Sequence, residues 1–226
     1  MDLSQQDSNA RAAVAKLSRT YALNDHQLDQ FAKYLSMLQE WNKMMNLTAI
    51  TDTQGIVSLH FDDSLQLSKA MDLSHVKMLA DVGTGAGFPG LALKIMFPAL
   101  PVLLIEVVQK KIEFLQAVVS ACGLEGVEIS GLDWRNFLRY PDYEIDLFVS
   151  RAALPTEELI RLFRPSCSYK NAQLVYWASK NWQASSPEEI DLKVKEFNYT
   201  VDGKSRKLVF FKRQDSSKDN YSLSSK

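Results

Sequence analysis

Cysteine and histidine are scarce in this chain, and their scarcity excludes several kinds of site. The sequence has two cysteines, Cys122 and Cys167, which stand far apart and form no C-x-x-C pair. Its three histidines, His26, His60 and His75, do not have the spacing of metal ligands. We therefore expect no bound metal ion and no structural disulfide.

Long apolar segments are also missing. The longest one, residues 91–108, is interrupted by two prolines and by the charged residues Lys94 and Glu106, so it cannot span a bilayer. The N-terminal residues MDLSQQDSNA are polar and do not form a signal peptide. These absences predict a cytoplasmic protein that has no membrane segment.

The chain has no excess of charge of one sign. Its 26 basic and 27 acidic residues leave a formal net charge of −1, which argues against nonspecific coating of nucleic acid. Basic residues nevertheless gather in two segments. Residues 203–213 contain five and no acid, and residues 151–182 contain five against Glu157 and Glu158. Each segment is either a solvated surface or a docking face.

What the chain does have is a glycine-rich stretch, DVGTGAGFPG, at residues 81–90. It follows a short apolar run, residues 76–80, that is typical of a buried parallel strand, and it leads into an amphipathic helix at residues 91–97. Glycines at alternate positions remove every Cβ from the turn, so the backbone can reach positive φ and a ligand can lie against it. The start of the helix adds free N–H donors.

The spacing of these glycines distinguishes between two cofactor classes. The pattern G-x-G-x-G differs from the dinucleotide fingerprint G-x-G-x-x-G, and it is typical of S-adenosylmethionine methyltransferases. A purely structural turn is the alternative. If the stretch binds the cofactor, the contacts come from its strand-end acid and its loop: Asp81, Gly83, Thr84, Gly85, Ala86, Gly87 and Phe88.

The end of the second strand supplies an acid. This strand, residues 102–105, leads directly to Glu106, which lies 25 positions after Asp81 (106 − 81). An acid at that place can accept hydrogen bonds from both hydroxyls of a ribose. Glu106 can also cap the helix that follows, and the two roles are compatible.

The next two strand ends add further candidates for the same site. The third strand is followed by Leu132, Asp133 and Trp134. Asp133 could contact the amino group of an adenine, and Trp134 could either stack on its ring or pack in the core. The fourth strand, residues 144–150, ends before Arg151, at the edge where open α/β sheets bind their ligands.

The alternation of strands and helices predicts an α/β protein with a Rossmann-like fold, in which a mostly parallel sheet carries an antiparallel C-terminal strand. Within the N-terminal part, the first dozen residues should fray. One helix should begin at Asn24, with Gln27 completing a capping box, and another should begin after Asp52. We expect three regions: a helical extension at 1–70, a methyltransferase domain at 71–213 and a disordered tail at 214–226.

With these residues in place, the chain resembles the glucose-inhibited-division-B family, the small-subunit (16S) ribosomal RNA guanine-N7 methyltransferases. The resemblance extends from Leu28 to Lys212 and depends on five motifs in the same order. They are W-N-x-x-x-N-L-T at residues 41–48, H-x-x-D-S at 60–64, D-V-G-T-G-A-G-x-P-G at 81–90, K-K-x-x-F-L at 110–115 and S-R-A at 150–152.

The resemblance implies that the chain uses S-adenosylmethionine to methylate N7 of a guanine in 16S ribosomal RNA, as free RNA or in the ribosomal particle. We expect the protein to be a monomer. The loop at 83–87 would hold the methionine part of the cofactor, and Glu106 its ribose. Arg151, the one residue assigned to catalysis, would donate hydrogen bonds at the mouth of the site. The H-x-x-D-S motif would be structural or adjacent to the cofactor.

Guanine N7 carries a free lone pair, so this reaction needs alignment and no general base. A chain without an obvious catalytic histidine or cysteine fits that requirement. We predict that the RNA docks across Arg151 and residues 203–213, because both are positive in a chain whose charge is otherwise balanced.

Two departures from the family lie beside the predicted pocket. The family usually follows its third strand with G-R-A-E, where this chain has GLDWR at residues 131–135, and it usually ends its fifth strand in Lys-Gly, where this chain has Trp177 and Ala178. The alternatives are therefore a diverged methyltransferase with another RNA substrate and a noncatalytic RNA-binding protein. A nicotinamide oxidoreductase would need the other glycine spacing.

Overall fold

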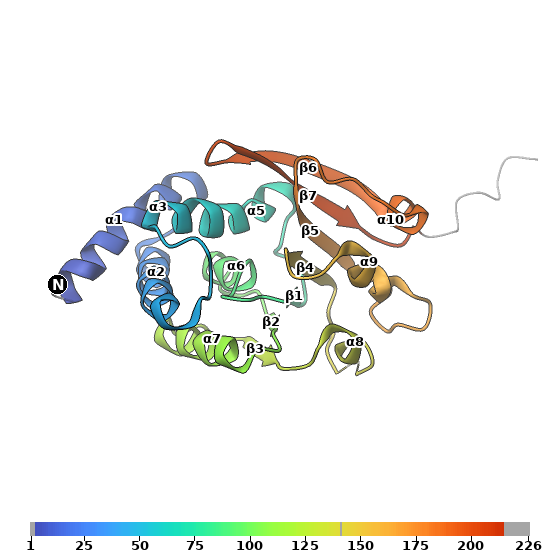
Figure 1. Cartoon of the computed structure of the whole chain (residues 1–226), viewed down its shortest axis with the longest axis horizontal. Helices are drawn as coiled ribbons and strands as arrows, with labels where there is room; N and C mark the ends of the chain where they lie inside the picture. The colour runs from blue at the N-terminus through green and yellow to red at the C-terminus, as the bar shows by residue number, and fades with distance from the viewer. Residues whose placement is uncertain (1–2, 141, 215–226) are drawn as a thin grey trace, which may run out of the picture.

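The computed structural model describes residues 3–140 and 142–214, with side chains from residue 8 onward. Residues 215–226, most of the tail that we expected to be disordered, lie outside the described residues. A seven-stranded sheet runs through the middle of the molecule and carries helices on both faces (Figure 1). The strand order is β3-β2-β1-β4-β5-β7-β6.

The pairing of the strands confirms the predicted sheet. Neighbours from β3 to β5 pair in parallel, and β7 pairs antiparallel with both β5 and β6. The parallel strands are β1 (Leu79–Val82), β2 (Val102–Ile105), β3 (Val127–Ser130), β4 (Leu147–Arg151) and β5 (Gln173–Ser179). The antiparallel strands are β6 (Lys193–Val201) and β7 (Lys204–Phe211).

Helices cover the sheet from both sides (Figure 1). One side holds α1 (Leu3–Tyr21), α2 (Asp25–Met45), α3 (Thr53–Ile56), the π-helical turn η1 (Val57–Asp62), α4 (Asp63–Leu65), α5 (Leu67–Ala70), α6 (Gly90–Met96) and α7 (Gln109–Ala121). The other side holds α8 (Trp134–Phe137), α9 (Thr156–Leu159) and the 3-10 turn η2 (Ile160–Phe163). Helix α10 (Pro187–Leu192) leads into β6.

Alternate residues of each strand face two separate cores, as the two-residue period of a strand requires. On one face, Leu79 and Val149 belong to the core formed with the N-terminal helices, α6 and α7. On the other face, Ala80 and Phe148 belong to the core formed with α8, α9 and η2. Strands β1 and β2 are buried along their whole length, which explains why both read as continuous apolar runs.

The first helix is longer than expected. Helix α1 begins at Leu3, so the prediction that the first dozen residues fray is wrong for residues 3–12. This helix packs against α2 and buries Ala10, Val14 and Leu17. Tertiary packing of an apolar stripe stabilises a helix whose sequence is otherwise polar.

The other two predicted helix starts are present. Asn24 accepts a hydrogen bond from Gln27 N at 2.9 Å, and Gln27 Oε1 accepts one from Asn24 N at 3.0 Å, which confirms the capping box of α2. Asp52 caps α3 by accepting from Gly55 N at 2.7 Å. The helix after Asp52 is interrupted by the π-helical turn η1, a local geometry that is frequent at functional sites.

Two buried glutamines join α2 to the rest of the fold. Gln27 Nε2 donates to the carbonyl oxygens of Ile95 and Met96, both at 2.9 Å, and Gln30 Nε2 donates to that of Cys122 at 2.8 Å. These carbonyls stand at the C-terminal ends of α6 and α7, where a helix has no partner of its own for them. Helix α2 therefore supplies the missing donors.

No described helix combines the length and the apolar character needed to cross a membrane. Within residues 3–140 and 142–214, no three side chains of His, Cys, Asp or Glu are grouped so that they could hold a metal ion. Cys122 and Cys167 are buried and free.

We predict that Gln27→Leu lowers the free energy of unfolding by about 2 to 3 kcal/mol. The change removes the donors to two buried carbonyls and the side-chain half of the capping box, and unpaired buried groups cost about 1 to 3 kcal/mol. Urea denaturation would measure the loss, with the exposed neighbour His26→Ala as the control. Equal losses in the two variants would contradict the role given to Gln27.

Candidate functional site

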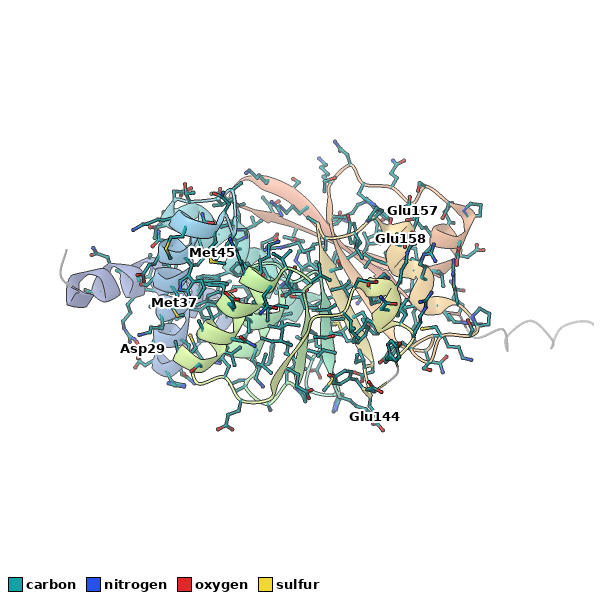
Figure 2. The ribbon with its side chains drawn as sticks, turned by 60° about the horizontal axis from the view of Figure 1, so that its bottom comes forward. Asp29, Met37, Met45, Glu144, Glu157 and Glu158 are labelled. Atoms are coloured by element: carbon teal, nitrogen blue, oxygen red, sulfur yellow. The ribbon has the colours of Figure 1, made fainter. Side chains whose placement is uncertain are left out.

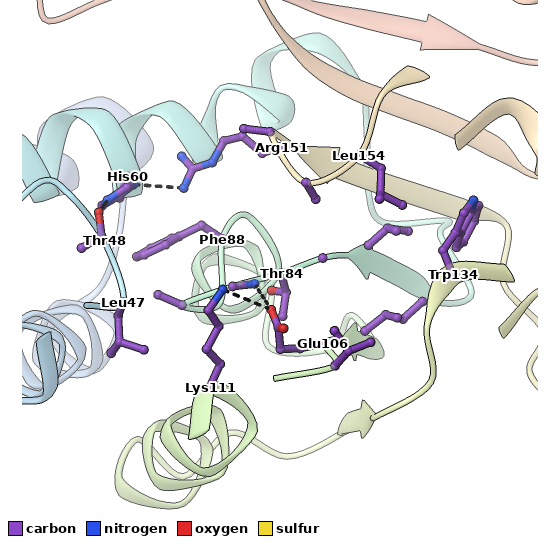
Figure 3. Close-up of a pocket in the computed structure, with 18 of the residues that line it drawn as sticks. Leu47, Thr48, His60, Thr84, Phe88, Glu106, Lys111, Trp134, Arg151 and Leu154 are labelled. Atoms are coloured by element: carbon purple, nitrogen blue, oxygen red, sulfur yellow. Dashed lines mark hydrogen bonds and ion pairs between the residues drawn. The ribbon is translucent and has the colours of Figure 1, made fainter. Parts of the chain in front are cut away.

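A cavity of about 610 Å³ opens at the carboxyl ends of β1, β2 and β4 (Figure 3). Of the residues predicted from the sequence, ten line it: Gly83, Thr84, Gly85, Ala86, Phe88, Glu106, Leu132, Asp133, Trp134 and Arg151. Asp81 and Gly87 do not. Sequence reasoning missed several wall residues that come from elsewhere in the chain: Leu47, Thr48, Ile50, Leu59, Lys111 and Arg206.

The glycine-rich loop turns one glycine toward the cavity and another away from it. A Cβ built on Gly85, at φ +61°, would meet only the oxygen of Gly83, at 4.0 Å. A Cβ on Gly87, at φ +96°, would lie 2.5 Å from Tyr34 Oη and 2.6 Å from Leu91 Cδ1. Both positions need glycine. At Gly85 the missing side chain leaves room in the cavity, and at Gly87 it leaves room for Tyr34 of α2, which packs against the side of the loop that faces away from the cavity.

Asp81 holds this loop from below. Its Oδ2 accepts hydrogen bonds from Thr84 Oγ1 at 2.6 Å and from Gly90 N at 2.7 Å. The side chain is fully buried, and burial raises its pKa to about 6 although both hydrogen bonds oppose that rise. Asp81 therefore shapes the loop, and its carboxylate does not reach the cavity.

Glu106 fixes the loop from the side of the second strand. Its Oε2 accepts from Gly85 N at 3.0 Å, and its Oε1 accepts from Val108 N at 2.9 Å, just before α7. Lys111 Nζ lies 4.0 Å from Oε2 (Figure 3). A carboxylate has about four acceptor positions. Two of them therefore take no part in these two hydrogen bonds, and the contact with the backbone before α7 leaves the predicted ribose-binding role possible.

The segment after β3 forms the wall at the far end of the cavity. Trp134 is 5% exposed, and its indole N–H donates to Glu158 O at 2.7 Å. Its ring also packs edge-on against Phe148, so Trp134 is a core residue whose surface reaches the cavity. Asp133 caps α8 by accepting from Arg135 N and Asn136 N, each at 3.1 Å.

The opposite wall is held by a buried carboxylate that the sequence did not single out for this role. Asp63 is fully buried. Its Oδ2 accepts from Arg151 Nη1 at 3.0 Å and from Arg206 Nη1 at 3.2 Å, and its Oδ1 accepts from Tyr199 Oη at 2.8 Å. Its backbone oxygen accepts from Trp177 Nε1 at 2.9 Å. Four strands, β4 to β7, thus meet the N-terminal helices at one residue.

These contacts bear on the prediction that RNA docks across the basic segment 203–213. Arg206 turns inward to Asp63, and Lys207 is 7% exposed and donates to Glu196 at 3.1 Å. Successive side chains of a strand point to opposite faces, so a basic run in β7 cannot present all its charges on one surface. Two of the side chains that we assigned to RNA docking, Arg206 and Lys207, thus form ion pairs within the fold.

Arg151 lies at the centre of the same wall and is only 12% exposed. Besides Asp63, its Nη1 donates to Leu59 O at 3.1 Å, and its Nη2 lies 3.0 Å from His60 Nδ1. The guanidinium also lies over the ring of Phe88, 5.2 Å from its centroid. Arg151 is therefore oriented by the protein.

These contacts fix the protonation of His60. Arginine has no acceptor, so Nδ1 must accept from Arg151, and the proton must sit on Nε2, which lies 2.7 Å from Thr48 Oγ1 (Figure 3). Burial, and then the charges of Arg151 and Arg206, lower the pKa of His60 to about 3. His60 stacks on Phe88 with ring centroids 4.6 Å apart. Both ring nitrogens are thus used internally, and the ring is neutral.

Sequence comparison identifies relatives of the chain. A family model described as rRNA small subunit methyltransferase G matches residues 27–216. Ribosomal RNA small subunit methyltransferase G of Geobacillus thermodenitrificans is 37% identical over 174 residues, 76% of this chain and 71% of that protein. The protein of the same name from Exiguobacterium sibiricum is 50% identical over 105 residues, 46% of this chain and 44% of that protein. The chain spans about half the length of the first curated relatives it matches.

Solved structures share the fold. A crystal structure of a protein named MtNAS, in complex with S-adenosylmethionine, aligns with a TM-score of 0.56 and 13% identity. The alignment covers 94% of this chain and 90% of that one. At this identity the likeness concerns the fold alone.

We predict that Asp63→Asn lowers the free energy of unfolding by about 3 to 5 kcal/mol, because it leaves the charges of Arg151 and Arg206 without their buried partner. Glu158→Gln is the matched control. Glu158 also pairs with two arginines, but its side chain is 27% exposed, so solvent screens the loss. Urea denaturation of both variants would test this, and equal effects would refute the assigned importance of Asp63.

We also predict a pH dependence of stability that comes from His60. The fold lowers the pKa of His60 from 6.5 to about 3. The contribution of neutral His60 to the free energy of unfolding is therefore fully present above pH 6.5 and is lost as the pH falls from 6.5 toward 3. Between pH 7 and pH 4.5, the wild type should lose about 2.5 kcal/mol more than His60→Gln. Both proteins keep Asp81, whose effect cancels in the difference. Identical pH profiles in urea denaturation would show that His60 does not resist protonation.

Proposed function

Because the chain belongs to the rRNA small subunit methyltransferase G family, we propose that it transfers a methyl group from S-adenosylmethionine to N7 of a guanine in small-subunit (16S) ribosomal RNA. The membership confirms the resemblance found in the sequence. The observation that carries the proposal is the loop at 83–87, whose Gly85 faces the cavity while its N–H is held by Glu106.

The residues present fit this cofactor. The cavity volume of about 610 Å³ lies in the range of about 300 to 1,000 Å³ that small-molecule sites occupy. Glu106 offers free acceptor positions for ribose hydroxyls, and Gly85 leaves room beside the backbone for the methionine part. Leu132, Asp133 and Trp134 would border the adenine. Asp81 and Gly87 would not contact the cofactor, and they would contribute by fixing the conformation of the loop.

When bound, S-adenosylmethionine supplies a methyl group on a positively charged sulfur. Guanine N7 already carries a lone pair, so the protein has only to align the two partners and exclude water. His60 is consistent with a reaction that needs no general base, since neither of its ring nitrogens is free to accept a proton from a substrate.

Arg151 keeps part of its hydrogen-bonding capacity for a substrate. A guanidinium has five N–H donors, and three of them are used on Leu59, Asp63 and His60, which leaves two (5 − 3). We propose that Arg151 uses them on a phosphate or on guanine O6, as a fixed donor at the mouth of the site.

The remaining expectations belong to the same proposal. The protein would act as a monomer in the cytoplasm, on free RNA or on the ribosomal particle. Residues 1–70 would be a helical extension of a methyltransferase domain at 71–213. Analytical ultracentrifugation would test the monomer.

We predict that Gly85→Ala weakens binding of S-adenosylmethionine at least about tenfold, because its methyl group would stand in the cavity. Gly123→Ala is a matched control, since Gly123 has φ +60° and no atom within 4 Å of its Cβ position, like the open Gly85. Both changes should cost about 1 to 2 kcal/mol of stability through backbone strain. Only Gly85→Ala should weaken binding in calorimetry, and equal affinities would remove the loop from the cofactor site.

The proposed reaction is tested by incubating the protein with methyl-labelled S-adenosylmethionine and small-subunit ribosomal RNA, free and in the particle. Mapping should place the label on N7 of a guanine, and Gly85→Ala should slow the transfer. Label on another base would refute the assigned position. Cofactor binding without transfer to either substrate would favour a noncatalytic RNA-binding protein.

A further inference from the structure

A second hollow of about 450 Å³ adjoins the candidate site across helix α8. Its charged walls are four arginines, Arg135, Arg139, Arg161 and Arg164, and we call it the arginine hollow. The first two come from α8 and the turn after it, and the other two come from η2 and its end. Trp134 lines the candidate site and the next residue, Arg135, lines the arginine hollow.

One carboxylate serves two of these arginines. Glu158 lies 2.8 Å from Arg135 Nη2 through its Oε1 and 2.8 Å from Arg161 Nε through its Oε2. Figure 2 shows Glu158 on α9 beside Glu157, on the opposite half of the molecule from Asp29, Met37 and Met45 of α2. The sharing of Glu158 leaves one of the two positive charges uncompensated.

The other two arginines have weaker partners. Arg139 Nη1 donates to the neutral Asn136 Oδ1 at 3.3 Å. The pKa of Asp133 is lowered first by the hydrogen bond from the backbone N–H of Asn136, and the charge of Arg139 adds to that effect. Arg164 is exposed and forms no ion pair with any residue that the structure describes. In the described residues, the four arginines that line the arginine hollow thus have one carboxylate as an ion-pair partner, Glu158, in a chain whose formal net charge is −1.

The side chains that line the arginine hollow favour a ligand with negatively charged oxygen atoms. Guanidinium groups only donate hydrogen bonds, and their planar fork matches the oxygens of a phosphate. Among the described residues that line the arginine hollow, none is acidic. Tyr140, next to Arg139 in the chain, is 56% exposed, and an exposed aromatic ring beside basic residues is typical of a surface on which nucleic-acid bases stack.

We infer that the arginine hollow holds backbone phosphates of the RNA strand whose target guanine enters the candidate site. The inference rests on the proposed function and adds where the RNA docks. A strand held there lies against α8, whose first residue borders the cavity, and Leu132 at the cavity rim is 40% exposed. The docking surface is thus on the α8 and η2 side of the pocket.

The test is the double variant Arg139→Ala with Arg164→Ala in the full chain. These two arginines do not hold Glu158, so the wall that Trp134 forms should stay intact and S-adenosylmethionine affinity should not change. The probe is a single-stranded fragment of small-subunit ribosomal RNA, titrated at several salt concentrations. Affinity should fall about tenfold, and the slope of log K against log salt should flatten by about 1.4, twice the 0.7 expected for each lost contact.

Two control variants accompany it. Lys16→Ala with Lys33→Ala removes two exposed charges from α1 and α2 and should leave affinity and slope nearly unchanged. Arg139→Lys with Arg164→Lys keeps the charge and should restore most of the slope. An Arg139/Arg164 alanine variant with wild-type RNA affinity and slope would overturn the inference, and so would an equal loss in the lysine control.

The failure of the inference and that of the proposed function are distinguishable. If the wild type neither binds S-adenosylmethionine nor methylates the RNA, the proposed function fails for every variant alike. If the wild type methylates RNA and the arginine variant behaves identically, only the docking surface is wrong. Loss of binding to phosphatidylglycerol vesicles with RNA binding preserved would assign the arginine hollow to a membrane surface and also overturn the inference.

Discussion

The buried carboxylate of Asp63 is the interaction on which the site depends. A charge without water must find its full set of partners inside the protein, because an uncompensated buried charge costs several kcal/mol. Arg151, Arg206 and Tyr199 supply those partners from three strands. Asp63 thereby joins the N-terminal helical segment, the end of the parallel sheet and the antiparallel hairpin in one place, and it does so at the wall of the cavity.

The effect of Asp63 reaches the cavity through a chain of hydrogen bonds. Because Asp63 holds Arg151, Arg151 can hold His60 in one tautomer, and His60 in turn meets Thr48 on the cavity wall. The glycine-rich loop is held on the other side by Tyr34, whose hydroxyl donates to Ala86 O. The Arg151 wall and the glycine-rich loop are therefore both held by residues from the N-terminal helices and the segment after α2, which act here as a structural part of the site. Such support is what keeps a site in one geometry.

The sequence predicts well those features that a single stretch of chain builds. The glycine-rich turn, the acid at Glu106 and the capping box at Asn24 each depend on local spacing, and a local pattern specifies them. The contact of Arg206 with Asp63 could not be predicted from local sequence, because a run of basic residues in a hairpin at the edge of a sheet is typical of an exposed surface. Its position follows from the pairing of β6 with β7, in which Tyr199 stands opposite Arg206.

Two other features were decided by contacts distant in sequence. The helix α1 looks too polar to persist alone, and packing on α2 stabilises it. Trp177, where the family usually has another residue, donates to the backbone of Asp63. That departure from the family is therefore part of the network that holds Arg151, and the geometry gives no sign that it disrupts the pocket.

The same network leaves no free proton acceptor on the Arg151 wall of the cavity. His60, the histidine that borders the cavity, uses both nitrogens internally, and Asp63 is saturated by cationic and phenolic donors. The polar groups on this wall thus serve geometry. A nucleophile that had to lose a proton would find no acceptor among them, whereas guanine N7 attacks with a lone pair that it already has. The wall is therefore compatible with the methyl acceptor that we propose, guanine N7, and under that proposal the choice among guanines comes from where the RNA strand is held.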